Sequence, residues 1–155
     1  VFSAAMSICR ASESDGITDM SYCGSSRTPF SDGMEANLTG YLEGDYTWEQ
    51  GWCINLVPWK ERTSLNDLMT ALLIRLHRDH GGNTFIKNLY REISKLPKLK
   101  GRDDHQGARD HFYMAASTAA GKDLREFFTE LRWNLSEEAI GQVGTSLAKQ
   151  ATSTE

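Results

Sequence analysis

The residues of this 155-residue chain best suited to chemistry are its four histidines, His77, His80, His105 and His111, with aspartates at positions 79, 103, 104 and 110. Imidazole and carboxylate groups are typical zinc ligands, and two histidines three residues apart share a helix face. The cluster therefore suggests a metal site. We favour the alternative, in which His77 and His80 lie in a last helical turn, where the dipole suits positive charge, and the aspartates cap the following helix.

The sequence lacks the local motifs of common enzyme classes. No histidine is followed by Glu-x-x-His, no serine stands in Gly-x-Ser-x-Gly, and the run His80–Asn83 has neither the spacing nor the ending of a phosphate-binding loop. Cys9, Cys23 and Cys53 match no C-x-x-C pattern and allow at most one internal disulfide, whose pairing stays open. We do not expect this chain to be active as an enzyme by itself.

The most aromatic segment lies between positions 45 and 59. It contains Tyr46, Trp48, Trp52 and Trp59. Such rings bury large apolar areas while keeping a polar edge, so they either complete a core or form a surface that stacks on a glycan or grips a protein. We favour the core, because a small domain needs large residues to close it. The binding surface is the functional alternative.

Charge is unevenly distributed along the chain. The formal net charge is −4, which argues against a general nucleic-acid binder, yet residues 60–102 contain ten Lys and Arg against four Asp and Glu. We favour the interpretation that these basic residues cover the solvated faces of helices. The alternative is a basic patch that binds an anionic glycan, nucleic acid or an acidic partner. No apolar run reaches the roughly 18 residues that suggest a membrane-spanning helix.

Apolar residues recur at helical spacing through the second half of the chain, which predicts a mainly α fold. We expect a bundle of about five helices over 64–80, 83–96, 104–120, 123–132 and 136–149, within a domain spanning 60–150. Before it we expect an irregular, Cys- and Trp-containing region over 1–59 that packs on the bundle and includes a short helix over 34–42. A disordered tail, 151–155, would follow.

Local chemistry also predicts where these helices begin and end. Ser, Asn and Asp side chains accept hydrogen bonds from the first free amides of a helix, whereas glycine and proline end helices. The expected N-caps are Ser64, Asn83, either Asp103 or Asp104, Asp123 and Ser136, and Asp67 would complete a capping box with Ser64. The expected ends are Gly44, Gly81-Gly82, Pro97 and Gly121.

Four segments in the last third of the chain together resemble a known family. They are Asp110–Ser117, Ala120–Leu124, Phe127–Phe128 and Trp133–Ser136. This run is similar to the helical lobe that follows the active site in the enhancin-like, mucin-degrading zinc metallopeptidases of the gluzincin class. The resemblance covers roughly residues 64–140.

The resemblance implies a secreted or surface-exposed parent peptidase that binds zinc and cleaves glycoproteins, with this chain as a non-catalytic subdomain that contacts the rest of that protein. The family holds zinc with the two histidines of HExxH, absent here, and with a later glutamate near Asn-Leu. Glu35, before Asn37-Leu38, is the nearest match to that third ligand, at a different spacing. The alternative is a stand-alone glycan- or protein-binding module that uses the four aromatic residues.

Overall fold

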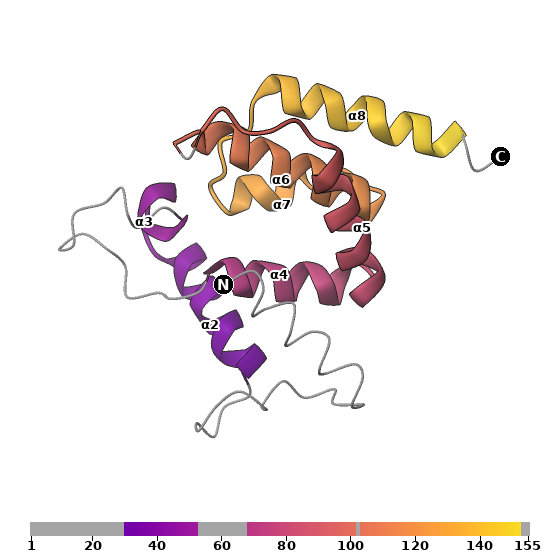
Figure 1. The fold of residues 1–155 in the computed structure, drawn as a ribbon. Coiled ribbons are helices and arrows are strands. Elements are labelled where there is room, and N and C mark those ends of the chain that lie inside the picture. Colours follow the sequence, from indigo (N-terminus) through magenta and orange to yellow (C-terminus); the bar gives the residue numbers. More distant parts are fainter. Residues whose placement is uncertain (1–29, 53–67, 102, 153–155) are drawn as a thin grey trace. The chain divides into compact units, whose positions relative to one another are not determined.

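The computed structural model describes residues 30–52, 68–101 and 103–152, and it confirms the mainly α class (Figure 1). The described residues form helices joined by turns and loops and contain no strand. No helix among them has both the length and the apolar character needed to cross a bilayer.

Contacts between backbone positions divide the chain into two compact units, Val1–Asp79 and His80–Glu155. The sequence analysis places the boundary at 59/60 instead and groups the helix predicted over 64–80 with the four that follow it. That helix packs within the first unit, because its apolar face contacts the helix of residues 30–43. We describe each unit by itself.

The first unit contains α2 (Phe30–Glu43), α3 (Trp48–Trp52) and α4 (Leu68–Asp79). Helix α4 packs against both α2 and α3. Among the described residues of this unit, the buried apolar ones are two residues of α2 and six of α4, namely Leu38, Tyr41, Leu68, Ala71, Leu72, Leu73, Ile74 and Leu76. The helical spacing read from the sequence therefore identified the buried face of α4. The predicted cap at Ser64 and Asp67 lies outside the described residues.

Within the region predicted over 1–59, the described residues 30–52 contain two helices. The helix predicted over 34–42 is present as α2, which begins earlier, at Phe30, and ends before Gly44 as expected. Helix α3 was not predicted. It begins with a capping box, in which the Thr47 backbone N–H donates to Gln50 Oε1 at 2.8 Å and the Gln50 backbone N–H donates to Thr47 Oγ1 at 3.3 Å.

The second unit contains α5 (Gly82–Lys95), α6 (His105–Ala120), α7 (Arg125–Glu130) and α8 (Glu137–Thr152). Helix α6 is central, since it contacts each of the other three (Figure 1). The buried apolar residues of the unit are Phe85, Ile86, Leu89, Tyr113, Ala115, Ala116, Leu124, Phe128, Leu131, Trp133, Ala139 and Val143. The small residues Ala115 and Ala116 allow close approach of neighbouring helices to α6. Helix α8 continues to Thr152, into the expected tail.

Most predicted ends of these helices are confirmed. Asp104 is the N-cap of α6, and its side chain accepts a hydrogen bond from the Gly107 backbone N–H at 3.0 Å. Gly121 ends α6 in the left-handed conformation, with φ 67°. Ser136 starts α8, because its Oγ accepts from the Ala139 backbone N–H at 3.1 Å. Helix α5 ends at Lys95, two residues before Pro97.

Two predicted starts differ. Asn83 is not the cap of α5, which already includes Gly82 and has Gly81 at its N-cap with φ 94°. Left-handed Gly81 reverses the chain so tightly that the helix begins before Asn83 is reached. Asp123 precedes α7 by two residues, with Leu124 at the N-cap, yet its Oδ1 accepts from the Arg125 backbone N–H at 2.8 Å.

Candidate functional site

Two of the four predicted aromatic binding residues, Tyr46 and Trp52, pack against the ring of Tyr41 in the first unit. Tyr41 is completely buried; its ring is stacked on that of Tyr46 with centroids 6.3 Å apart, and it meets Trp52 edge-on at 5.6 Å. Tyr46, Trp48 and Trp52 are each partly exposed. They therefore pack on the core and still offer some ring surface. Trp59 lies outside the described residues.

The metal-ligand candidates are spread over several helices. Glu35 lies on α2, and its side chain is outside the described part of the structure. His77 is in the last turn of α4, as expected, but α4 ends at Asp79, so His80 is not on that helix. The His80 ring instead lies 5.7 Å from that of Phe85. No group of three or more metal-ligating side chains comes together within the described ranges.

Several residues of the segments quoted for the resemblance form hydrogen bonds between α6 and the segments of α7 and α8. Asp110 of α6 is buried, and its Oδ1 accepts hydrogen bonds from the Ser136 backbone N–H and from Gln106 Nε2, both at 3.0 Å. Gln106 also donates to the Asn134 carbonyl at 2.9 Å. One carboxylate of α6 thus fixes the first residues of α8, which follow it by 26 positions in the sequence.

A second set of polar contacts joins α6 to α7. The fully buried Ser117 accepts, through Oγ, from the Leu124 backbone N–H at 3.2 Å. The Tyr113 hydroxyl donates to Asp123 Oδ1 at 2.7 Å, and Arg125 donates to Asp123 Oδ2 at 2.8 Å. The turn after α6 is therefore held from both sides by side chains of the helices that it connects.

This environment shifts the pKa values of both partners in the Tyr113–Asp123 hydrogen bond. Burial raises the pKa of the Tyr113 hydroxyl well above its ordinary value, and its bond to Asp123 raises it further. Burial also acts to raise the pKa of Asp123, but hydrogen bonds from Tyr113 and Arg125 outweigh that effect and lower the pKa below its ordinary value. The neutral hydroxyl and the ionised carboxylate are the stable forms, which suits a structural contact rather than proton transfer.

Aromatic rings fill the space beneath these contacts. Phe128 of α7 is completely buried, with ring centroids 4.9 Å from Trp133, 5.8 Å from Tyr113 and 6.0 Å from Phe112. Phe127 meets Phe128 edge-on at 5.4 Å but remains partly exposed. Of the two adjacent phenylalanines in the resemblance, Phe128 is the core residue.

On another side of α6 the second unit has an open groove, which we call the α6 groove. Its wider part has a volume of about 500 Å³ and is bordered by the loop Leu96–Lys100, by α6 and by the first turns of α8. An adjoining hollow of about 150 Å³ continues it between α5, α6 and α8. Leu96, Met114 and Gln142 line both parts, so the two hollows are direct neighbours.

The lining of the α6 groove mixes apolar, amide and charged side chains. Met114, Ala115, Ala139 and Val143 supply apolar surface, and Gln106 and Gln142 add side-chain amides. The charged lining residues of the wider part are Lys98, Lys100, Asp104, Asp110 and Glu138, and His111 adds an imidazole ring. No phenylalanine, tyrosine or tryptophan lines either part. The groove could not be predicted from the sequence, because its lining residues lie up to 54 positions apart, from Glu92 to Ser146, and form no recognisable motif.

Comparison with known proteins adds no relative: no family model, no curated protein and no solved structure matches this chain. The interpretation of the second unit therefore relies on its own geometry.

Proposed function

We propose that this chain is part of an exported zinc metallopeptidase acting on mucin-like glycoproteins, in which the residues from His80 onward form a non-catalytic helical lobe that shapes the substrate cleft. One observation carries the proposal. The residues that resemble the enhancin-like family are the ones that hold α6, α7 and α8 together, through Asp110, Ser117, Asp123 and Phe128. A shared sequence pattern is informative when it coincides with the contacts that set a fold.

The role proposed for this lobe is to position substrate. The α6 groove offers a concave, partly apolar surface held between fixed helices, and such surfaces are where ligands bind. Zinc and the HExxH helix would belong to another part of the parent protein. Glu35 on α2 stays a prediction as third ligand.

The proposal is tested first with the purified 155-residue chain. Incubated with casein and with mucin, it is expected to leave both intact. Cleavage that a chelator abolishes would contradict the assignment of a non-catalytic lobe. A catalytically active preparation without chelator sensitivity would contradict it as well, since it would place hydrolytic residues in this chain.

A second test concerns the coding sequence upstream of Val1. An HExxH motif in the same reading frame is expected. A full-length protein that contains the motif should cleave mucin, and exchanging the HExxH glutamate for glutamine should abolish cleavage. A complete reading frame without the motif would overturn the proposal.

The partial exposure of Tyr46, Trp48 and Trp52 favours a second candidate, a binding module that uses these rings on a glycan or protein. Tryptophan fluorescence titrated with mucin-type sugars tests it. A saturable shift that Trp52→Ala reduces and Trp133→Phe leaves in place would support this candidate, because Trp133 is buried in the second unit. If no sugar shifts the fluorescence, the second candidate is wrong and the three rings serve the core.

A further inference from the structure

We propose that Asn134 is an N-glycosylation site of this chain. The inference rests on the export included in the proposed function, because the enzymes that attach such glycans act on exported chains, and it adds a modification site to that function. The triplet Asn134-Leu135-Ser136 has the acceptor pattern Asn-x-Ser/Thr, with a middle residue other than proline. A second triplet, Asn37-Leu38-Thr39, has the same pattern. The folded structure distinguishes the two.

The modification joins the side-chain amide of asparagine to a sugar. Its co-substrate is an oligosaccharide that a pyrophosphate links to a membrane lipid. The amide nitrogen forms a bond to the anomeric carbon of the first sugar and releases one proton, while the bond from that carbon to the pyrophosphate oxygen breaks and the lipid pyrophosphate leaves. The acceptor therefore needs an accessible amide nitrogen and a surface position that accommodates a bulky polar group.

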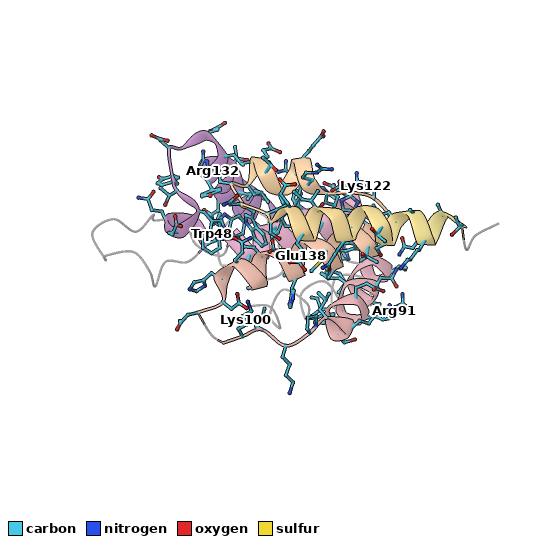
Figure 2. All side chains as sticks on the ribbon, turned by 90° about the horizontal axis from the view of Figure 1, so that it is seen from above. Trp48, Arg91, Lys100, Lys122, Arg132 and Glu138 are labelled. Carbon is cyan, nitrogen blue, oxygen red and sulfur yellow. The ribbon has the colours of Figure 1, made fainter. Side chains whose placement is uncertain are left out.

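The side chain of Asn134 meets both requirements. Asn134 is exposed and lies in the irregular connection between α7 and α8, where Figure 2 labels Arg132 before the triplet and Glu138 after it. Its backbone carbonyl accepts a hydrogen bond from Gln106 Nε2 at 2.9 Å, whereas its side-chain amide bonds to no residue in the ranges that the structure describes. A glycan on this nitrogen would therefore replace no hydrogen bond of the described fold.

The residues on either side of Asn134 are anchored in the second unit. Before it, Trp133 is 5% exposed and packs on Phe128, with ring centroids 4.9 Å apart. After it, the Ser136 backbone N–H donates to the buried Asp110 at 3.0 Å. The connection is thus fixed at both ends of the triplet, and the side chain of Asn134 remains on the surface of the folded chain.

Ser136 has a role in the fold as well as in the triplet. Its Oγ accepts from the Ala139 backbone N–H at 3.1 Å, which starts α8, and the hydroxyl hydrogen can still donate to another group. Threonine supplies both the cap and the acceptor pattern, whereas alanine supplies neither. Substitution of Ser136 by threonine should therefore preserve the glycan, and substitution by alanine should abolish it.

The other triplet is part of a helix. Asn37, Leu38 and Thr39 all lie within α2, where Asn37 is half-buried and Leu38 is 1% exposed. Side chains two positions apart on a helix do not face each other, so the folded triplet does not present its amide and its hydroxyl to one enzyme site. A bulky group on Asn37 would also stand beside a residue of the buried face of α2. We expect the glycan on Asn134 and not on Asn37.

The test expresses the full 155-residue chain behind a cleavable leader in a eukaryotic secretory cell. The secreted protein and the microsomal fraction are both digested with peptide N-glycosidase, so that a chain that is not secreted is analysed as well. One digestible glycan is expected. Because the digestion converts the carrier asparagine to aspartate, peptide mapping should find aspartate at position 134. A chain without glycan, or a glycan on Asn37, would overturn the inference.

Matched variants locate the site. Asn134→Gln should abolish the mobility shift on digestion, and Asn37→Gln should leave it unchanged. Ser136→Thr should keep the shift, and Ser136→Ala should lose it. The pair at Ser136 separates the acceptor pattern from the chemistry of Asn134 itself. A shift that persists in Asn134→Gln, or that disappears in Asn37→Gln, would contradict the assignment.

This experiment is independent of the tests of the proposed function. The added leader supplies the export, so the result does not depend on an HExxH motif upstream of Val1 or on mucin cleavage. A glycan on Asn134 in a chain whose reading frame lacks HExxH would keep the modification site and overturn the proposed function. An HExxH motif upstream together with an unmodified Asn134 would do the reverse.

Discussion

The contacts inside the first unit of this chain differ in kind from the contacts inside the second. In the first unit the ring of the buried Tyr41 packs against Tyr46 and Trp52, and the polar contacts described there are local, within a few residues of Thr47. In the second unit polar side chains of α6 also bond to backbone groups of the segment before α8, over 26 and 28 residues of sequence, at Asp110–Ser136 and Gln106–Asn134. Apolar packing tolerates many sequences, whereas directed hydrogen bonds require particular residues at particular positions.

The largest expected effect comes from the aromatic centre of the second unit. Phe128→Ala should destabilise the protein by about 3–5 kcal/mol, because it removes a completely buried ring and leaves a cavity next to Trp133 and Tyr113. The free energy of unfolding from urea denaturation measures this loss. Phe127→Ala is the matched control and should cost clearly less, since that ring is partly exposed. Equal losses would show that the two phenylalanines share the core.

A pair of tyrosines compares the units directly. Tyr113→Phe deletes a buried hydroxyl that donates to Asp123 at 2.7 Å and should cost about 1.5–3 kcal/mol, the usual range for hydrogen bonds to charged groups. Tyr41→Phe deletes a hydroxyl that lies 3.5 Å from the Thr47 carbonyl and should cost less than about 0.5 kcal/mol. Hydrogen exchange resolved by peptide would show in which unit each loss occurs. Similar losses from both substitutions would remove the contrast between the units.

The carboxylate that connects α6 to α8 gives the third prediction. Asp110→Ala should cost about 1–3 kcal/mol, because the Ser136 backbone N–H loses its acceptor. Asp110→Asn should cost less, since an amide oxygen can still accept that hydrogen bond. Faster hydrogen exchange at 136–143 in the alanine variant would confirm that the start of α8 is affected. Unchanged exchange there would place the role of Asp110 elsewhere.

The smallest effect is a dependence on pH. The pKa of Asp123 is lower in the folded protein than in the unfolded chain, so the unfolded chain binds protons more readily as the pH falls. The contribution of Asp123 to the free energy of unfolding is complete above its unfolded pKa of about 4. This contribution is lost as the pH falls through the lower pKa of the folded protein. The Asp123→Asn variant should therefore lose less stability than the unchanged protein between about pH 5 and pH 2. Parallel acid-unfolding curves for the two proteins would contradict this origin.

Signals that act within a few residues were readable from the sequence. Asp104, Gly121 and Ser136 were identified as helix ends because a cap requires only a suitable side chain and the backbone next to it. Helix α3 was missed although its start, Thr47 to Gln50, is a capping box, because the segment was interpreted by its aromatic residues, as core or binding surface, and not by its helix signals. Asn83 was predicted as the N-cap of α5, and this was wrong because the N-cap is Gly81.

Contacts between distant segments were not readable. Asp110 looked like one more aspartate beside a histidine, and its partner Ser136 looked like an ordinary helix cap. Nothing in the spacing of two such residues shows that one accepts a hydrogen bond from the other. The α6 groove is hidden for the same reason, because its walls, the loop Leu96–Lys100 and the first turns of α8, are far apart in the sequence.

Helix α8 is attached to α6 near both of its ends. This attachment bears on how fast a ligand could associate with the groove between them. Ser136 fixes its start to Asp110, while Ser146 and Gln150 lie within 3.5 Å and 3.4 Å of Thr118 atoms. Contacts near both ends should restrain the motion of α8 relative to α6. We therefore expect a ligand of the groove to associate in a single exponential phase, at a rate proportional to its concentration.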